Sequence, residues 1–332
     1  MLYNNSKDSI NNPLYDFLTF RKEDYIIHAH AGINGLELIV DQSSTDPLDA
    51  ASDLRSETEK LVVVIMPSIA HTILDGIALM AEWFDAYPEA EIIILEDLYI
   101  HNPKDPRSVK YDTDVLDVCI AILQERGAKI TRITGKILIN NFYEVSSPGF
   151  SIPKTVHTYR ALGSLADGLA TSEKPYRKVY ISRSKINGRG FSDEHYTNNS
   201  MLTDDCRVYN EEHLEQLFVE MGFEIVYFEE MGSFVEQMSI MKESKIVAGV
   251  SGAGLTSSVF MRPGTTVVEI STLILAPDSA RRLRPSWHHH LSDLAFSVNL
   301  NKVSVPVVEY RDGIDVASRI RSTPMFDYLK NY

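Results

Sequence analysis

The stretch Lys245–Ile270, KIVAGVSGAGLTSSVFMRPGTTVVEI, carries the residues best suited to chemistry in this sequence. A buried-strand pattern ends at Val250, and Ser251-Gly252-Ala253-Gly254 then opens a predicted helix. Backbone N–H groups and the macrodipole at a helix N-terminus favour an anion, so this turn suits a phosphate or a diphosphate. The alternative is that the glycines only allow a tight turn between strand and helix.

A carboxylate follows this turn one βα unit later. Pro263-Gly264 predicts a turn, and the strand Val267–Ile270 contains Glu269 just before its apparent end. At the carboxyl end of a strand, a carboxylate can accept hydrogen bonds from both hydroxyls of a ribose. The alternatives for Glu269 are a salt bridge to Arg262 and a helix cap.

Alternating strand and helix patterns surround these residues and must position them. In the second half, short apolar runs bounded by turns predict buried parallel strands over 178–182, 224–228, 246–250 and 266–270, with helices over 211–221 and 234–243 and from about 255. In the first half, the same alternation predicts strands over 61–66, 92–95, 129–133 and 137–140, with helices over 72–84, 114–126 and 155–169. Gly127 suits the C′ position of the helix 114–126.

The chain divides into two α/β domains of similar size. The Pro-, Gly- and Ser-rich residues 146–153 and the polar TSEKPYRK that begins at Thr171 indicate an interdomain connection, so we expect domains over 1–170 and 171–314. We expect residues 315–332 to form a helix that is broken at Pro324 and packs back on the first domain. Two such domains imply a cleft between them, where ligands usually bind.

Composition excludes several classes of protein. The chain has 32 Lys plus Arg and 46 Asp plus Glu, for a net charge of −14, and 44% hydrophobic residues, which excludes disorder and disfavours a nucleic-acid partner. Cys119 and Cys206 lack CxxC or metal-ligand spacing, so neither a disulfide framework nor a zinc site is indicated. Without a leader-like segment or a run of ~18 apolar residues, we expect a cytoplasmic protein with no membrane span, whose apolar surface is buried in its own core or in a homo-oligomer.

Six blocks of the second half resemble glycosyltransferase family 61 in their order and spacing. They are VYISR at 179–183, RVYNE at 207–211, GFE at 222–224, SFVEQ at 233–237, GVSGAGL at 249–255, and FM, PG and VVE between Phe260 and Glu269. The resemblance is strong over 178–270 and weaker after Trp287. In the first half, Ala70-His71 with Asp75 is similar to the family's His-containing helix start.

The resemblance implies a GT-B-like architecture, in which two Rossmann-like domains face a central cleft and the C-terminal one holds the nucleotide-sugar donor. It also implies an inverting hexosyl- or pentosyltransferase that takes a UDP- or GDP-sugar as co-substrate, acts on a glycan acceptor and requires no metal or other cofactor. One departure is Ser251, because the family usually has His before Gly-Ala-Gly. A hydroxyl can still donate to a phosphate oxygen, but it lacks the charge and titration of an imidazole.

Basic residues near the turn would complete the implied donor site. Arg183 immediately follows a predicted buried strand, so its guanidinium can grip a diphosphate and stabilise the leaving nucleotide. Lys185 or Arg189 can add charge, and Gln237 is a weaker candidate from its family block. The alternative for Arg183 is a surface ion pair.

An inverting transfer needs a base within hydrogen-bond reach of the acceptor hydroxyl, on the face opposite the leaving diphosphate. His71 and Asp75 lie at i and i+4 on the helix after the strand 61–66, which puts them on one face near the expected cleft. Either His71 is the base and Asp75 orients it, or Asp75 is itself the base. The alternative is that His71 caps a core helix and Asp75 is solvated.

Three patterns invite a metal and are discounted. Asp112-Thr113-Asp114 spells the DxD signature that holds a divalent ion in another glycosyltransferase architecture, but here we expect it to head a helix as an N-cap. His288-His289-His290 are consecutive, and consecutive residues rarely converge on one ion. His28 and His30 alternate in a strand-like run, which favours a structural or acceptor-site role.

The sequence therefore predicts a two-domain glycosyltransferase. The alternatives are a nucleotide-sugar epimerase of the same architecture and a non-catalytic glycan-binding protein. A Rossmann dehydrogenase is disfavoured, because Ser-Gly-Ala-Gly lies late in the chain and lacks the GxGxxG spacing with an acid ~20 residues further on.

Overall fold

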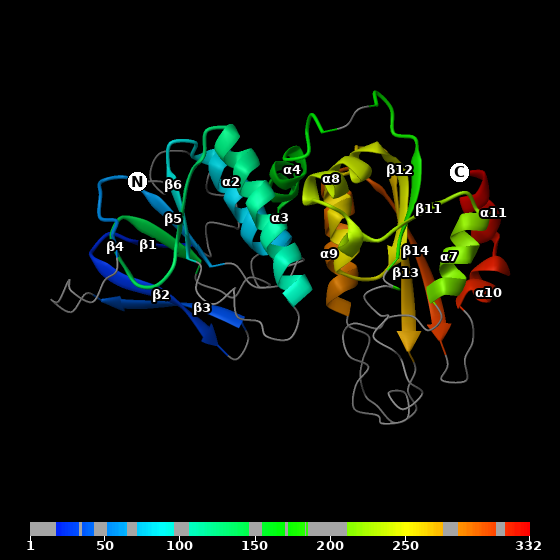
Figure 1. The fold of residues 1–332 in the computed structure, drawn as a ribbon, viewed down its shortest axis with the longest axis horizontal. Coiled ribbons are helices and arrows are strands. Elements are labelled where there is room, and N and C mark those ends of the chain that lie inside the picture. Colours follow the sequence, from blue (N-terminus) through cyan, green and yellow to red (C-terminus); the bar gives the residue numbers. More distant parts are fainter. Residues whose placement is uncertain are drawn as a thin grey trace. The chain divides into compact units, whose positions relative to one another are not determined.

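The computed structural model describes residues 18–32, 35–42, 52–64, 72–95, 106–145, 155–169, 172–182, 184, 211–274, 285–309 and 316–332. The chain forms two compact units, residues 1–165 and residues 166–332. Both are mixed α/β with parallel strand pairs (Figure 1).

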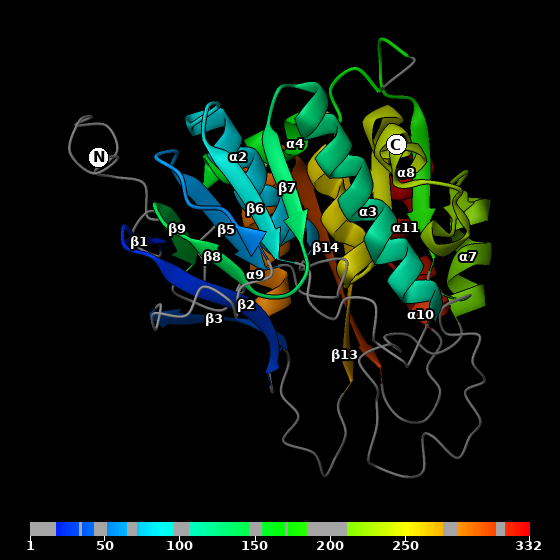
Figure 2. The same cartoon turned by 60° about the vertical axis from the view of Figure 1, so that its left-hand side comes forward.

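A mostly parallel sheet organises the first unit, in the order β1-β9-β5-β6-β7. Its strands are β1 (Leu18–Arg21), β5 (Lys60–Val64), β6 (Glu91–Leu95), β7 (Lys129–Ile133) and β9 (Phe142–Val145). Only the pair β1–β9 is antiparallel among the described pairs of this sheet. Figure 2 shows β5, β6 and β7 side by side. β5 and β6 are continuous apolar runs, as expected for strands covered on both faces, and the strands predicted here are confirmed.

A smaller sheet packs against this one, in the order β3-β2-β8-β4. Its strands are β2 (Tyr25–Gly32), β3 (Gly35–Gln42), β4 (Ser52–Asp53) and β8 (Ile137–Ile139). Alternate residues of β2, Tyr25 and Ile27, share a core with Ile139 of β8 and with Ile93 and Phe142 of the larger sheet. Tyr25 and Ile27 therefore share one face of β2, and Ile26 on the opposite face is buried as well.

The helices of the first unit follow the predicted pattern with one correction. In the part of this unit that the structure describes, they are the π-helix η4 (Thr72–Ile77), α2 (Ala78–Ala86), α3 (Pro106–Glu125) and α4 (Val156–Ser164). α3 begins at Pro106, because Pro is pre-organised for the first helical position, so Asp112-Thr113-Asp114 lies inside the helix and the predicted N-cap is wrong. Gly127, with φ +103°, follows α3 as predicted, and the Ala128 N–H donates to the Leu123 carbonyl at 2.9 Å.

One parallel sheet organises the second unit, in the order β11-β10-β12-β13-β14. Its strands are β10 (Arg177–Ile181), β11 (Glu224–Val226), β12 (Ser244–Val250), β13 (Thr266–Ile274) and β14 (Asn301–Glu309), and every described pair is parallel. In chain order this is 2-1-3-4-5, one of the two common doubly wound orders. β13 and β14 run on past the ends of the other strands (Figure 1, Figure 2).

Helices cover both faces of this sheet. The turn η7 (Phe228–Glu230), α8 (Phe234–Glu243), the 3₁₀-helix η8 (Ala253–Phe260) and α9 (Pro285–Ser297) lie between successive strands, and α8, η8 and α9 cover one face. The other face carries α7 (Glu211–Glu220), α10 (Val316–Arg321) and α11 (Pro324–Asn331) (Figure 1).

The C-terminal helices correct one prediction. The chain breaks at Pro324 as expected, since α11 starts there. However, Val316, Ile320 and Leu329 are buried in the core of the second unit, together with Phe218 of α7. The apolar side chains of the segment therefore complete the core of the second unit, where packing on the first domain was predicted. Among the described helices, none combines the length and the apolar character needed to span a bilayer.

Candidate functional site

The carboxyl ends of β10 and β12 form the topological switch point of the second sheet. The two strands are neighbours, but the chain leaves β10 toward β11 and leaves β12 toward β13, on the opposite side. α7 follows β10 and lies on one face of the sheet, whereas η8 follows β12 and contacts α8 and α9 on the other face (Figure 1). In doubly wound sheets this divergence opens the crevice that binds ligands. The topology therefore brings Ser182 and Ser251, which follow these strands, to the position expected for a ligand.

The Ser251–Gly254 turn follows β12 directly, as predicted, and packs against β10. A Cβ added at Gly254 would come within 3.2 Å of Ile181 Cγ2, and one added at Gly249 would come within 3.2 Å of Leu255 Cδ2. Close packing thus explains Gly254 of the turn and Gly249 of β12, and for Gly254 it agrees with the alternative to anion binding. The helix after the turn is 3₁₀ rather than α, and the Leu255 N–H donates to the Gly252 carbonyl at 3.1 Å. Anion binding by the turn stays a prediction.

Ser251 and Glu269 are in direct contact, which the sequence did not predict. The Ser251 hydroxyl donates to Glu269 Oε1 at 2.7 Å, and the Ser251 N–H donates to the Ile270 carbonyl at 2.9 Å. Glu269 Oε2 forms an ion pair with Lys302 Nζ of β14 at 2.8 Å, although the Glu269 side chain is only 2% exposed. Lys302 Nζ also donates to Ser292 Oγ of α9 at 2.9 Å. Hydroxyls and opposite charges therefore link β12, β13, β14 and α9 on one face of the sheet.

Two details of the Glu269 prediction need correction. β13 continues to Ile274, so Glu269 does not stand near the end of its strand. It instead shares a row with Gly249, near the end of β12. The salt bridge of Glu269 is made with Lys302, whereas Arg262, the partner in the salt-bridge alternative, donates to the carbonyls of Ser172 and Glu173.

A second polar cluster at the end of β10 was missed from the sequence. Ser182 Oγ and Ser184 Oγ donate to Glu215 Oε1 at 2.5 and 2.6 Å, and the Tyr180 hydroxyl and Ser182 Oγ each lie 3.4 Å from Glu211 Oε1. Burial raises the pKa of Tyr180 well above its ordinary value, and Glu211 and Glu215 add to the shift. The sequence signal for this cluster is the pair Glu211 and Glu215, which lie at i and i+4 at the start of α7. The cluster therefore includes Ser182 and Ser184, the residues on either side of position 183.

Gln237 is a fully buried side chain of α8 in this structure. Its Nε2 donates to the Phe228 carbonyl at 3.1 Å, which ties the start of α8 to η7, after β11. This contact gives the buried amide a partner, as a buried polar group needs.

Several predicted site residues lie outside the described part of the chain. They are His71, Arg183 and Lys185, together with the side chains of Asp75 and Ala253. The backbone of Asp75 belongs to η4, a π-helix with i→i+5 hydrogen bonds. The α-helical i, i+4 argument for His71 and Asp75 therefore does not transfer to this segment. The side chains of Asp112, His28, His30 and His288–290 are also outside the described part.

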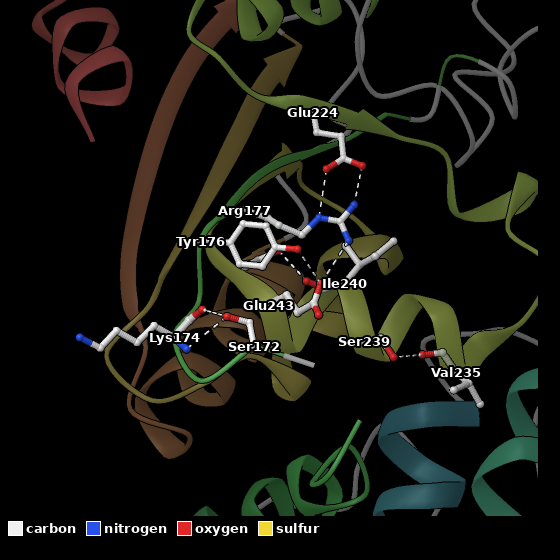
Figure 3. Close-up of polar contacts among 10 residues, drawn as sticks. Ser172, Lys174, Tyr176, Arg177, Glu224, Val235, Ser239, Ile240 and Glu243 are labelled. Carbon is white, nitrogen blue, oxygen red and sulfur yellow. Dashed lines mark hydrogen bonds and ion pairs between the residues drawn. The ribbon is translucent and has the colours of Figure 1, made fainter. Parts of the chain in front are cut away.

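A hollow of about 500 Å³ lies along the outer edge of β11, lined in part by Arg177, Tyr227, Met231 and Ile240. Figure 3 shows the Arg177 guanidinium between two carboxylates. Its Nε and Nη2 donate to Glu224 at 3.0 and 2.5 Å, and its Nη1 lies 3.6 Å from Glu243 Oε2. No predicted site residue lines this hollow. Within the described residues, no group of three or more His, Cys, Asp or Glu side chains is arranged to hold a metal ion.

One known protein family matches more than half of this sequence. The sequence model described as Glycosyltransferase 61 matches residues 69–268. The matched range includes His71, Asp75, the Arg183 region, Gln237 and the Ser251–Gly254 turn, and it ends one residue before Glu269. None of the curated proteins compared with this sequence matches it.

Proposed function

The chain belongs to glycosyltransferase family 61, and we propose that it moves a sugar from a UDP- or GDP-sugar to a glycan hydroxyl, with inversion and without a metal. Glycosyltransferase activity in general follows from the family, and the donor class and the mechanism are our extension. The observation that supports the donor site is the switch point at the ends of β10 and β12, where the Ser251–Gly254 turn lies beside the strand that leads to Arg183.

In this proposal the second unit binds the donor. Arg183, with Lys185, neutralises the diphosphate, and the N–H groups at the start of η8 bind its oxygens. Glu269 accepts the ribose hydroxyls, because a carboxylate beyond the phosphate turn is the group that accepts from a ribose in doubly wound folds. Gln237 supports the site from behind through the β11–α8 connection.

The chemistry consists of positioning and leaving-group stabilisation. A base in the first unit, His71 or Asp75, removes the proton of the acceptor hydroxyl, whose oxygen then attacks the anomeric carbon from the face opposite the diphosphate. The bond to the diphosphate breaks as the new glycosidic bond forms, so the configuration inverts. Arg183 and the turn stabilise the charge that develops on the leaving nucleotide. A GT-B arrangement, with the two units facing a shared cleft, would bring base and donor together.

Titration with nucleoside diphosphates tests the proposal. We expect one nucleoside diphosphate to raise the melting temperature, because a ligand that binds only the native state stabilises it. The shift should persist in EDTA and be lost in Arg183→Ala. The control is Arg321→Ala, which removes the same charge from an exposed pair with Glu220 on α10 and α7.

The outcomes separate the possible functions. No stabilisation by any nucleoside diphosphate at millimolar concentration would contradict a nucleotide-sugar site. Stabilisation that EDTA abolishes would contradict metal independence. Conversion of the free nucleotide sugar without an acceptor would indicate an epimerase, which membership in family 61 does not favour.

A further inference from the structure

One glutamate of α7 connects the two residues that flank position 183. Glu215 Oε1 accepts the Ser182 hydroxyl at 2.5 Å and the Ser184 hydroxyl at 2.6 Å. The Ser184 N–H also donates to Ser182 Oγ at 3.1 Å, a turn in which a serine side chain accepts from the backbone two residues further on. These contacts close a ring of hydrogen bonds around the chain where it leaves β10.

Both sides of this ring are anchored in the core of the second unit. Ser182 is 1% exposed, and its N–H donates to the Val226 carbonyl at 2.9 Å, which extends the pairing of β10 with β11 by one residue. α7 packs on β10 through Tyr180 and Phe218, whose ring centroids lie 4.3 Å apart. A side chain on an anchored helix holds its partners more precisely than one on a loop. Glu215 therefore fixes the start of the segment after β10 relative to the sheet.

The stability of α7 does not by itself account for a glutamate at position 215. The helix macrodipole favours acidic residues in the first turn, where Glu211 and Glu212 lie, and its effect falls off within that turn. Glu215 is the fifth residue of α7 and lies beyond this range. Its two short contacts with the serines after β10 are the interactions that explain this carboxylate.

We propose that Glu215 is a positioning residue of the donor site, which holds Ser182 and Ser184 and thereby fixes the backbone on both sides of Arg183. This inference rests on the proposed function, in which Arg183 binds the diphosphate. Residue 183 lies outside the described residues, and its two neighbours carry the inference. With the backbone fixed in advance, the donor does not have to order it on binding, which avoids an entropy cost. Glu215 acts through Arg183 and binds no part of the donor itself.

Calorimetric titration with the nucleoside diphosphate that stabilises the wild type tests the inference. Glu215→Ala removes the acceptor of both hydroxyls, so the backbone at position 183 must be ordered on binding. We expect Glu215→Ala to bind this ligand about tenfold more weakly than wild type, which corresponds to fixing one residue. Glu215→Gln keeps an oxygen that can accept both hydroxyls and should retain most of the affinity. Ser184→Ala removes one of the two contacts and should fall between Glu215→Ala and wild type.

The nucleoside without phosphates is the second probe, because it has no diphosphate for Arg183 to bind. Its binding, measured by saturation-transfer NMR at millimolar concentration, should be the same in wild type and in Glu215→Ala. The matched control is Glu212→Ala, which removes the same charge from an exposed position on the same helix. This control should bind the nucleoside diphosphate as wild type does.

Three results would overturn this inference and leave the proposed function standing. The first is binding of the nucleoside diphosphate that Glu215→Ala leaves unchanged. The second is an equal loss in Glu215→Ala and Glu215→Gln, which would assign the effect to the charge and not to the contacts with the serines. The third is an equal loss for the nucleoside and its diphosphate, which would assign Glu215 a structural role only. Absence of binding by the wild type would overturn the proposed function and this inference with it.

Discussion

Buried polar side chains gather where β10 and β12 end. Ser251 and Glu269 lie on the face covered by η8 and α9, whereas Glu211 and Glu215 lie at the start of α7, on the opposite face. A buried polar group that lacks a partner costs about 1–3 kcal/mol, so the serine partners of these carboxylates stabilise the fold as well as shaping the edge. Polar side chains therefore lie on both faces of the sheet at the carboxyl ends of β10 and β12, where doubly wound sheets bind their ligands.

The packing of Gly254 against Ile181 makes a testable prediction. In Gly254→Ala the new methyl would lie 3.2 Å from Ile181 Cγ2, so the turn or the isoleucine must shift. Overpacking of this kind costs about 1–3 kcal/mol, and we expect the free energy of unfolding in urea to fall by about 1–2 kcal/mol. Adding Ile181→Leu removes the Cγ2 methyl and should recover part of the loss.

Gly232→Ala is the control for this substitution. The nearest atom to a Cβ at Gly232 is Glu236 Oε2 at 3.8 Å, at the end of a flexible exposed side chain. We expect its free energy of unfolding to stay within about 0.5 kcal/mol of wild type. A Gly254→Ala variant as stable as Gly232→Ala would show that the contact with Ile181 is not restrictive.

Lys60 gives a pH-dependent prediction. The residue opens β5, is 1% exposed, and its Nζ donates to the Thr58 carbonyl at 2.8 Å. Burial lowers the pKa of Lys60, with Glu91 and Glu57 opposing the shift. In the unfolded chain the lysine pKa is about 10.4. At pH values between the lowered pKa of native Lys60 and about 10.4, the unfolded chain therefore binds more protons than the native state. Over that window the contribution of Lys60 to the free energy of unfolding must rise with pH.

Urea unfolding of wild type and Lys60→Met at several alkaline pH values measures this effect. The difference in unfolding free energy, wild type minus variant, should increase as the pH rises toward the lysine value of about 10.4. Lys22→Met, at an exposed lysine of the same unit, is the control. A difference that is flat or falls with pH would contradict the prediction.

At the scale of elements, local pattern predicts the strands and helices that have a strong period. β5, β6, β12 and β13 contain runs of β-branched residues, and these runs locate the strands, although β13 continues four residues beyond its predicted end. The start of α3 was misplaced because its first turns, PRSVKY, carry little apolar period. The small sheet was not predicted because β4 has two residues, and its pairing with β8 joins positions far apart in the chain.

The sequence likewise predicts one part of the candidate site and not the other. The turn after β12 and the end of β10 could be predicted, since each follows a strong strand pattern directly. Lys302 could not, because its contact with Glu269 depends on the register of β13 and β14, across a segment of more than thirty residues that the local pattern does not constrain. Arg262 was the nearer candidate in sequence, but it is engaged with the carbonyls of Ser172 and Glu173.

The start of α4 gives a prediction at this scale. Thr155 Oγ1 accepts from the Thr158 N–H at 3.1 Å, and Thr158 Oγ1 accepts from the Thr155 N–H at 3.0 Å, which forms a reciprocal capping box. Thr158 Oγ1 also donates to the buried Glu82 of α2 at 2.6 Å. Thr155→Ala should lower the free energy of unfolding in urea by about 1–2 kcal/mol, and Thr155→Ser should restore most of it. Equal stability of Thr155→Ala and wild type would contradict the cap.

At the scale of the whole molecule, each unit has its own sheets and its own core: two sheets in the first unit and one in the second. In the second unit, five parallel strands are covered on both faces by helices of the same unit. α11 closes this unit: Lys178 Nζ donates to the Leu329 carbonyl at 2.9 Å, and the Tyr332 and Thr266 hydroxyls lie 2.6 Å apart. The contacts of α10 and α11 therefore belong to the fold of the second unit.

Two fragments test this assignment. We expect residues 166–332 to unfold cooperatively in urea and to keep the nucleoside diphosphate response of the full chain, because the proposed donor groups and their core lie within them. Residues 166–309 lack α10 and α11, and with them the buried Val316, Ile320 and Leu329. Three such side chains contribute roughly 4–9 kcal/mol, against about 5–15 kcal/mol for a typical domain, so the shorter fragment should lack a cooperative transition. A cooperative transition of equal midpoint in both fragments would show that the C-terminal helices belong elsewhere, and loss of folding in the longer one would show that the second unit depends on the first.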